Sequence, residues 1–173
     1  MVDQHTAHER VLYEEFLSAW PRGNDAGHPL EIQPLLIPQQ VDLPFSKSAV
    51  LRDHIHLLEE AGCKIESFGE TTFLIRELPA LIAKMDVASF LDEVVEDLMD
   101  LGVTGVVDQC IRTIVSSMAC HGAVRAHQSM SLPEIKALLE MYFQRKTPST
   151  CPHGRPIVIR YSLLDLEKLF RRK

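Results

Sequence analysis

The stretch CKIESFGETTFLIRE, residues 63–77, decides the fold class of this chain. Two runs rich in β-branched and aromatic residues, 63–68 and 71–77, are separated by Gly69 and Glu70, a pattern that predicts a β-hairpin. The segments before and after it have the period of amphipathic helices. A hairpin set between helices indicates an α+β protein.

Hydrophobic periodicity and terminator residues predict the remaining elements. Gly62 is placed to end the helix before the hairpin, and Ser131 with Glu134 forms a capping box that starts a later one. The predicted helices are 5–20, 46–61, 87–101, 106–126, 131–144 and a closing helix over 163–172. The predicted strands outside the hairpin are 31–37, ended by Pro38, and 157–161, and the predicted loops are 23–29 and 146–150.

The length of 173 residues fits one domain or two small lobes folded together. Within it, residues 41–112 are predicted to form an inserted helix–hairpin lobe, and residues 1–40 with 113–173 the remainder. No run approaches the roughly 18 apolar residues of a membrane helix, and the N-terminus lacks the order of a signal peptide. We therefore expect a cytoplasmic protein whose four cysteines are thiols, buried in the core or bound to metal.

The formal net charge of −6 argues against tight unaided binding to DNA. Sequence-independent affinity for DNA comes mainly from Lys and Arg that neutralise phosphates. A DNA enzyme of this composition would need metal ions to offset its acidic residues, and a partner or further domain to deliver it.

Two short segments carry candidate metal ligands. His5 and Glu9 are spaced i, i+4 on a predicted helix that Asp3 precedes, so the two side chains can converge on one ion. Cys151 and His153 offer a thiolate and an imidazole in a proline-containing loop. This donor set suits zinc, and the carboxylates could also hold manganese or magnesium, which would activate water for hydrolysis.

Each of these residues also has an ordinary structural interpretation. Asp3 alone is more often a helix cap, and Glu9 alone a solvated helix residue. Cys151 is usually buried and inert, and His153 a loop residue bonded to backbone. Neither segment by itself indicates that the two lie close together in the folded protein.

Four motifs in order resemble those of MutL mismatch repair proteins that have nuclease activity. The family pattern Asp-Gln-His-Ala-x-x-Glu-x-x-x-x-Glu matches residues 3–14, except that Thr6 stands where the family has alanine. Ala-Cys-x matches 119–121, Cys-Pro-His-Gly-Arg-Pro matches 151–156, and Phe-x-Arg matches 170–172. The motifs span nearly the whole chain, and together they are far more specific than any one alone.

The resemblance implies a metal-dependent endonuclease that nicks one strand of duplex DNA in mismatch repair. It implies the metal ligands His5, Glu9, Cys120, Cys151 and His153, with Asp3 essential to the same site. Glu14, the last acid of the first motif, faces away from His5 on an ideal helix. We therefore expect it to act outside the set of direct ligands, in an ion pair with Arg10 or a basic residue of the closing helix.

Three more residues are predicted to support the site or contact phosphate: Arg155, Phe170 and Arg172. For the first of them, holding the site's acids in place and contacting phosphate are equally open. His8 and His121 adjoin ligands but are expected to face elsewhere.

The resemblance also implies cofactors, partners and roles for the two lobes. Zinc is expected as a structural or regulatory ion and manganese or magnesium as the catalytic one, while ATP would bind only an N-terminal domain outside this chain. Residues 1–40 with 113–173 would dimerise and hold the metal, and 41–112 would be regulatory. The expected partners are a second copy, DNA at the bacterial nucleoid, the replication sliding clamp and the mismatch-recognition protein MutS.

Two other functions stay open. One is a structural-zinc module for dimerisation and clamp docking, without nuclease activity, favoured by the negative charge. The other is a metallohydrolase unrelated to DNA, which rests on the ligand set alone.

The segment Gln33-Pro-Leu-Leu36-Ile-Pro38 resembles the peptide by which repair proteins bind the sliding clamp. The equally weighted alternative is a buried edge strand that a proline ends.

MutL domains of this kind have strands just before the first motif, so Val2 is expected to be the tail of such a strand and the chain a fragment or a shortened form. The sheet would then lack an edge.

Overall fold

The structure is a computed structural model that describes residues 1–20, 30–102, 106–125, 128–145 and 148–172. Its elements in chain order are α1 (Gln4–Ala19), β1 (Ile32–Asp42), α2 (Phe45–Glu60), β2 (Lys64–Ser67), β3 (Thr72–Pro79), the 3₁₀ helix η1 (Ala80–Ile82), α3 (Val87–Leu101), α4 (Val107–Gly122), α5 (Leu132–Gln144) and α6 (Leu163–Leu169). Helices and a small antiparallel sheet coexist, which confirms the predicted α+β class.

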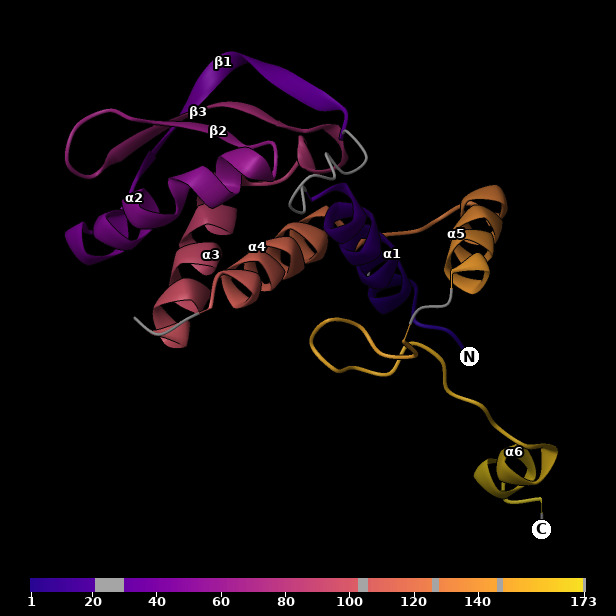
Figure 1. Cartoon of the computed structure of the whole chain (residues 1–173). Coiled ribbons are helices and arrows are strands. Elements are labelled where there is room, and N and C mark those ends of the chain that lie inside the picture. Colours follow the sequence, from indigo (N-terminus) through magenta and orange to yellow (C-terminus); the bar gives the residue numbers. More distant parts are fainter. Residues whose placement is uncertain (21–29, 103–105, 126–127, 146–147, 173) are drawn as a thin grey trace. The chain divides into compact units, whose positions relative to one another are not determined.

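The hairpin of residues 63–77 forms as predicted and becomes part of a three-stranded sheet. The strand order is β1-β3-β2, and both pairings are antiparallel. The central strand, β3, buries Phe73, Ile75 and Leu78. Helix α2 runs along the sheet and packs on β2 and α3, and α3 in turn packs on α4 (Figure 1).

Gly62 ends α2 because it adopts a backbone conformation that other residues disfavour. Its φ of +87° allows the amide of Cys63 to donate to the Leu58 carbonyl at 2.9 Å, and its own amide donates to Glu59 at 2.9 Å. This is the Schellman pattern of helix ends. A Cβ added at Gly62 would lie 2.5 Å from Cδ1 of Ile32, so the turn also permits close approach of β1.

Side-chain caps start α3, α5 and α6. Asp86 accepts from the Ala88 amide at the start of α3, and capping boxes begin α5 at Ser131 and α6 at Ser162. The Ser131 box is the one predicted from sequence. Hydrogen bonds from Ser131 hold the pKa of Glu134 below its ordinary value.

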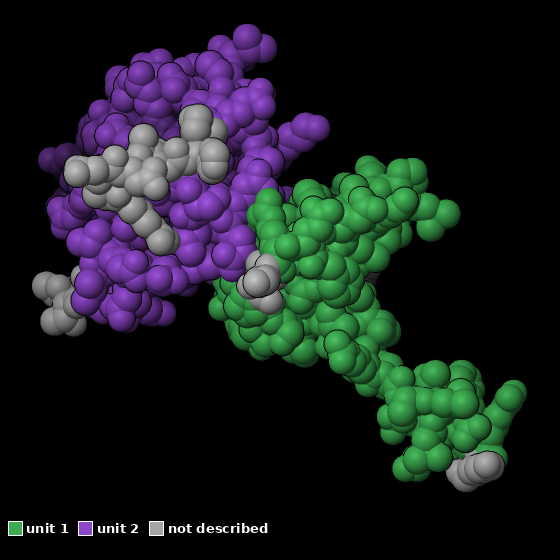
Figure 2. Space-filling model, turned by 45° about the vertical axis from the view of Figure 1, so that its right-hand side comes forward, with its two compact units in different colours: residues 1–11, 123–173 green, residues 12–122 purple. Residues whose placement is uncertain are grey.

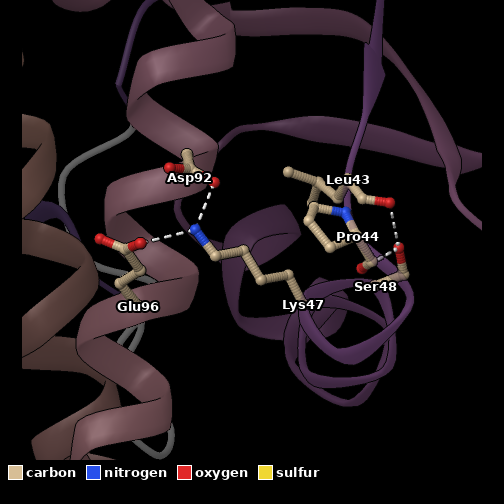
Figure 3. A network of polar contacts seen from close by, with 6 residues as sticks. All are labelled: Leu43, Pro44, Lys47, Ser48, Asp92 and Glu96. Atoms are coloured by element: carbon tan, nitrogen blue, oxygen red, sulfur yellow. Dashed lines mark hydrogen bonds and ion pairs between the residues drawn. The ribbon is translucent and has the colours of Figure 1, made fainter.

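Lys47 joins α2 to α3 through two ion pairs (Figure 3). Its Nζ lies 2.6 Å from Oδ1 of Asp92 and 2.6 Å from Oε1 of Glu96. The hydrogen bonds to these carboxylates raise the pKa of Lys47. One residue further along, the Ser48 hydroxyl is 3.2 Å from the Leu43 carbonyl and 3.0 Å from the Pro44 carbonyl, which fixes the turn that enters α2.

The chain divides into two compact units, coloured separately in Figure 2. Unit 1 comprises residues 1–11 and 123–173, and unit 2 comprises residues 12–122. Unit 2 contains the sheet with α2, α3 and α4. The buried core of unit 1 consists of Ala7, Val11, Leu138, Tyr142, Cys151 and Ile157. The predicted division into a dimerising part and a regulatory part at 41–112 concerns roles, and it stays a prediction.

Three predicted boundaries are wrong. The strand from residue 31 continues past Pro38 to Asp42, because β1 is an edge strand and its pairing with β3 shifts between Pro34 and Gln39, where a missing amide costs little. The helix predicted for 106–126 ends at Gly122. The closing helix ends at Leu169, where Phe170 leaves helical geometry.

The strand predicted for 157–161 is also wrong. A strand needs a neighbour that continues its hydrogen-bond ladder, and in the described chain only the isolated pair Val2 and Val158 forms there. The predicted loop 23–29 and positions 126, 146 and 147 lie outside the described residues.

The four cysteines are free thiols. Cys63 and Cys110 are buried in unit 2, and burial raises the pKa of Cys63 to about 12. No helix in the described part of the chain combines the length and apolar character needed to cross a membrane.

Candidate metal centre

Helix α1 begins at Asp3, whose carboxylate caps it. Oδ1 of Asp3 accepts from the amides of His5 at 2.9 Å and Thr6 at 3.1 Å, which satisfies two amides that the helix itself leaves unpaired. The ordinary interpretation of Asp3 is therefore correct. A role in the metal site would have to be added to it and stays a prediction.

Glu9 lies on the inner face of α1, between two residues of the unit 1 core. Ala7 and Val11 pack in that core beside Cys151, and Glu9 is 0% exposed. A carboxylate withdrawn from water loses its hydration and needs compensating partners. Its interpretation as a solvated helix residue is wrong, because the helix presents this face to the core.

The second donor segment, residues 151–156, forms a tight turn that backbone hydrogen bonds stabilise. The amide of Cys151 donates to the Arg155 carbonyl at 2.8 Å, and the amide of Gly154 donates back to Cys151 at 2.9 Å. Gly154 takes a φ of +80°, which its lack of a Cβ allows. The turn directs Cys151 into the core and leaves the ring of His153 nearer the surface.

Arg10 ties this turn to α1. Its Nε donates to the Thr150 carbonyl at 2.8 Å, and Arg10 is only 7% exposed. The sequence suggested Arg10 only as an ion partner for Glu14. Its bond to a backbone carbonyl 140 residues away carries no sequence signal.

Glu9, Cys151 and His153 meet in one cluster. Their donor atoms all lie within 4.8 Å of one another, and the ring Nδ1 of His153 is hydrogen-bonded to Oε1 of Glu9. Cys151 is 1% exposed, whereas the side chain of His153 is 39% exposed. The cluster is thus buried on one side and open to solvent on the other.

The chemistry of this cluster fits a divalent cation. Oε2 of Glu9 is buried without a hydrogen-bond partner among the described residues, and an unpaired buried carboxylate oxygen is costly. A cation would compensate that oxygen. One carboxylate, one thiol and one imidazole match the ligands of zinc, and the carboxylate also suits manganese or magnesium.

His5 is oriented as a metal ligand would be, but it is not one of the three clustered residues. Its Nδ1 is 3.0 Å from the Val124 carbonyl. An N–H donated there leaves Nε2 as the acceptor, which is the arrangement common in metal-binding histidines. Cys120 lies half-buried on α4 in unit 2. Both residues remain predicted ligands.

The other predicted site residues are not part of the cluster in the described chain. Glu14 is half-buried on α1, and Arg155 is exposed in the 151–156 turn. Phe170, at the end of α6, is 74% exposed, and Arg172 is exposed beyond it. Their roles as catalytic, supporting or phosphate-binding groups stay predictions.

His8 and His121 bond to other partners, as expected. The ring Nδ1 of His8 accepts from the Val124 amide at 3.0 Å. The ring of His121 is 2.7 Å from Oε2 of Glu93 on α3 and packs edge-on against Phe90.

The segment 33–38 lies on β1, at the edge of the sheet in unit 2. Gln33 is exposed, and Leu36 is 103% exposed, with Ile37 at 80%. Gln33 and Pro34 still pair with β3, and the register shift between Pro34 and Gln39 takes residues 35–38 out of regular pairing. The alternative of a buried strand that Pro38 ends is wrong on both counts, since the side chains are exposed and the strand continues.

Comparison with known sequences gives consistent matches to one family. The sequence model described as "MutL C terminal dimerisation domain" matches residues 1–130. The chain is 34% identical over 172 residues to the DNA mismatch repair protein MutL of Geotalea daltonii, covering 99% of this chain and 28% of that protein. It is 38% identical over 176 residues to MutL of Pelotomaculum thermopropionicum, covering 99% and 27%. It is 33% identical over 173 residues to MutL of Halothermothrix orenii, covering 100% and 26%. The chain thus spans about a quarter of the length of these relatives.

Proposed function

The chain belongs to the family of MutL C-terminal dimerisation domains, and on that premise we propose that it is a metal-dependent endonuclease domain that nicks one strand of duplex DNA in mismatch repair. The observation that carries this proposal is the cluster of Glu9, Cys151 and His153, in which a buried carboxylate oxygen lacks a partner among the described residues. Mismatch repair is the process named for the relatives. Nicking is the activity proposed for this chain.

Glu9, Cys151 and His153 would hold the ion, with His5 and Cys120 as further proposed ligands. When bound, a divalent ion supplies a Lewis acid for a phosphoryl oxygen and lowers the pKa of a coordinated water. Zinc is proposed for the thiolate-containing set, in a structural or regulatory role. Manganese or magnesium is proposed as the catalytic ion, because carboxylate oxygens suit these harder cations.

The protein's own contribution is to keep these donors in place. Arg10 fixes the turn through Thr150, and the hydrogen bond from the His5 ring to Val124 orients that imidazole. The core around Cys151 excludes water from one side of the cluster. The exposed edge of His153 leaves the other side accessible to a substrate.

A plasmid-nicking assay tests the proposal. Supercoiled plasmid is incubated with the chain, manganese and a sliding clamp, and the relaxed form is quantified. Glu9→Gln and His153→Gln are expected to abolish nicking, and Asp3→Asn to reduce it. The matched control is His56→Gln, because His56 is an exposed histidine on α2 in unit 2. Nicking by Glu9→Gln at the parental rate would overturn the assignment.

The alternative function, a structural-zinc module for dimerisation and clamp docking, is favoured by one observation. The donor set includes a thiol that is 1% exposed, as in closed structural zinc sites. A chelator separates the two functions. Loss of circular dichroism on metal removal, with no nicking in any metal, would support the structural role.

The segment 33–38 is proposed to bind the sliding clamp. Leu36 has no packing to lose, because it is fully exposed, and an exposed edge strand offers unpaired backbone groups to a partner. Tethering to a clamp would raise the local concentration of the domain at DNA. MutS as a partner remains a prediction from the family.

Homodimerisation is the assembly that the family description supports. We place its interface on the apolar side chains of α6, since no residue of that helix is buried. These side chains are Leu163 (74% exposed), Leu164 (54%), Leu166 (40%) and Leu169 (67%). Exposed apolar clusters of this kind mark contact surfaces.

A further inference from the structure

The charge of this chain is divided unequally between its two units. Unit 1 carries 11 Lys and Arg residues against 6 Asp and Glu residues, whereas unit 2 carries 7 against 18. The formal net charge is therefore +5 for unit 1 and −11 for unit 2. The overall net charge of −6 is thus the sum of one basic and one acidic unit. Electrostatic repulsion of a phosphate backbone is expected for unit 2 and not for unit 1.

Unit 1 contains an open groove of about 480 Å³ with basic side chains in its wall. Its lining residues are Tyr142, Phe143, Arg145, Ser149, Val158 and Arg160. None of them is acidic. Two guanidinium groups, two hydroxyls and no carboxylate make a lining suited to an anion, since arginine presents several N–H donors to phosphate oxygens.

Backbone contacts position the walls of the groove. Arg145 follows the last residue of α5, and its Nη1 donates to the Val11 carbonyl at 3.1 Å. On the other wall the amide of Ile157 donates to the Ser149 carbonyl at 2.9 Å. Val158 pairs with Val2 in an isolated bridge, which leaves Arg160 two residues further along and exposed.

The groove adjoins the turn that carries the metal donors. Ser149 precedes Cys151 by two residues, a span of at most roughly 7 Å in extended chain. Successive phosphates of one DNA strand advance by about 3.4 Å along the helix axis. A strand seated in the groove would therefore bring a neighbouring phosphodiester to the cluster within a few nucleotides.

We propose that this groove binds the sugar–phosphate backbone of duplex DNA, with Arg145 and Arg160 each contacting a phosphate. The inference deepens the proposed function and rests on it for the identity of the nucleic acid. Its independent support is the charge complementarity of a groove without acidic lining in a unit of net charge +5. Contacts to phosphate position a protein on DNA without selecting sequence, which suits a nuclease that would act at mismatches in any sequence.

Binding is measured without cleavage. The anisotropy of a fluorescent 30-base-pair duplex is titrated with the full chain in chelator, at several salt concentrations. Arg160→Gln is expected to weaken binding, and Arg145→Gln with Arg160→Gln to weaken it by at least roughly tenfold. The slope of log affinity against log salt should fall by about 1 for each arginine removed.

Lys136→Gln is the matched control, because it removes one charge from unit 1 outside the groove. Lys136 is 78% exposed on α5 and pairs only loosely with Glu140, at 3.8 Å. Equal losses in the control and in Arg160→Gln would show that net charge alone matters, and would overturn the groove. Parental affinity in the double variant would also overturn the groove. The same holds if free inorganic phosphate at low millimolar concentration abolishes DNA binding while neither arginine substitution changes the affinity.

The nicking assay on the same proteins separates this inference from the proposed function. If DNA binding depends on the two arginines but no metal supports nicking, the DNA-binding role of the groove is kept and the proposed nuclease activity is rejected. Nicking that the double variant performs at the parental rate would retain the nuclease and remove the groove.

Discussion

The side chains of Glu9 and His153 are hydrogen-bonded to each other although 144 positions separate them in the sequence. This contact joins the first helix to a turn near the end of the chain. Cys151 completes the group from the core side, so one carboxylate, one imidazole and one thiol from two distant segments have their donor atoms within 4.8 Å of one another.

Metal should stabilise the chain through this cluster. A ligand present at a hundred times its dissociation constant adds about 2.7 kcal/mol to the free energy of unfolding. Thermal unfolding with and without zinc or manganese should show this stabilisation in the parent, and Glu9→Gln and Cys151→Ser should lose it. His56→Gln should retain it. If metal raises the unfolding temperature of the parent and of Glu9→Gln equally, the assignment of the metal centre is wrong.

Leu36→Ala should weaken binding to the sliding clamp and leave the thermal stability unchanged. Leu36 is 103% exposed, so its truncation removes no internal packing. Gln33→Ala should add to the effect. Ile37→Ala is the control, since Ile37 is 80% exposed but is not one of the residues predicted to bind the clamp, which are Gln33, Leu36 and Pro38. Calorimetric titration that finds the same affinity for Leu36→Ala and the parent would retire the clamp segment.

Gly62→Ala should destabilise the chain by about 1–3 kcal/mol, mainly because a φ of +87° is costly for alanine. The new Cβ would lie 2.5 Å from Cδ1 of Ile32, the flexible end of a side chain that is 37% exposed, so moving it adds a smaller cost. Gly69→Ala isolates the backbone cost, because its φ is +105° and nothing lies within 4 Å, and it should lose about 1–2 kcal/mol. Urea denaturation measures both, and equal losses would contradict the predicted clash.

The capping box of α5 should contribute to stability in a pH-dependent way. Hydrogen bonds from Ser131 lower the pKa of Glu134 from its ordinary 4.5. A carboxyl group whose pKa is lowered by folding stabilises the protein above its unfolded pKa, and this contribution is lost as the pH falls through the folded pKa. The stability difference between parent and Ser131→Ala, measured by urea denaturation, should therefore be constant above about pH 5.5 and shrink towards pH 3. A difference that grows on acidification would refute this.

Leu169→Glu should dissociate a dimer formed through α6. Leu169 is 67% exposed, so the substitution costs the isolated chain little, whereas a charge buried in an interface is expensive. Met99→Glu, at 44% exposure on α3 in unit 2, is the control. Sedimentation velocity should show a monomer for the first variant and the parental assembly for the second. A dimer in both would place the interface elsewhere.

Local signals in the sequence determined most of the elements. The hairpin at 63–77, the helix that Gly62 ends and the capping box at Ser131 were all predictable, because each depends on residues within a few positions of one another. The ends that were wrong depend on neighbours. Pro38 does not end β1 because that strand lies at the sheet edge. Residues 157–161 form no strand in the described chain, because their backbone pairing with residues 1–3 amounts to the single bridge of Val2 and Val158.

The candidate site was predictable as a set of residue types, and its burial was not. The family motifs named Glu9, Cys151 and His153, yet only the packing of α1 in the unit 1 core withdraws the Glu9 carboxylate from water. No local sequence pattern predicts the hydrogen bond from Arg10 to Thr150. The same is true of the groove that Arg145 and Arg160 line.

The sequence alone thus determined the order of helices and strands, the family and the chemistry of the donors, since these follow from neighbouring residues and from motifs. The tertiary structure decided which donors meet, which oxygen is left without a partner among the described residues, and that the basic residues gather in the unit that holds the cluster. The physical reason is that burial and charge compensation depend on contacts between segments more than a hundred residues apart.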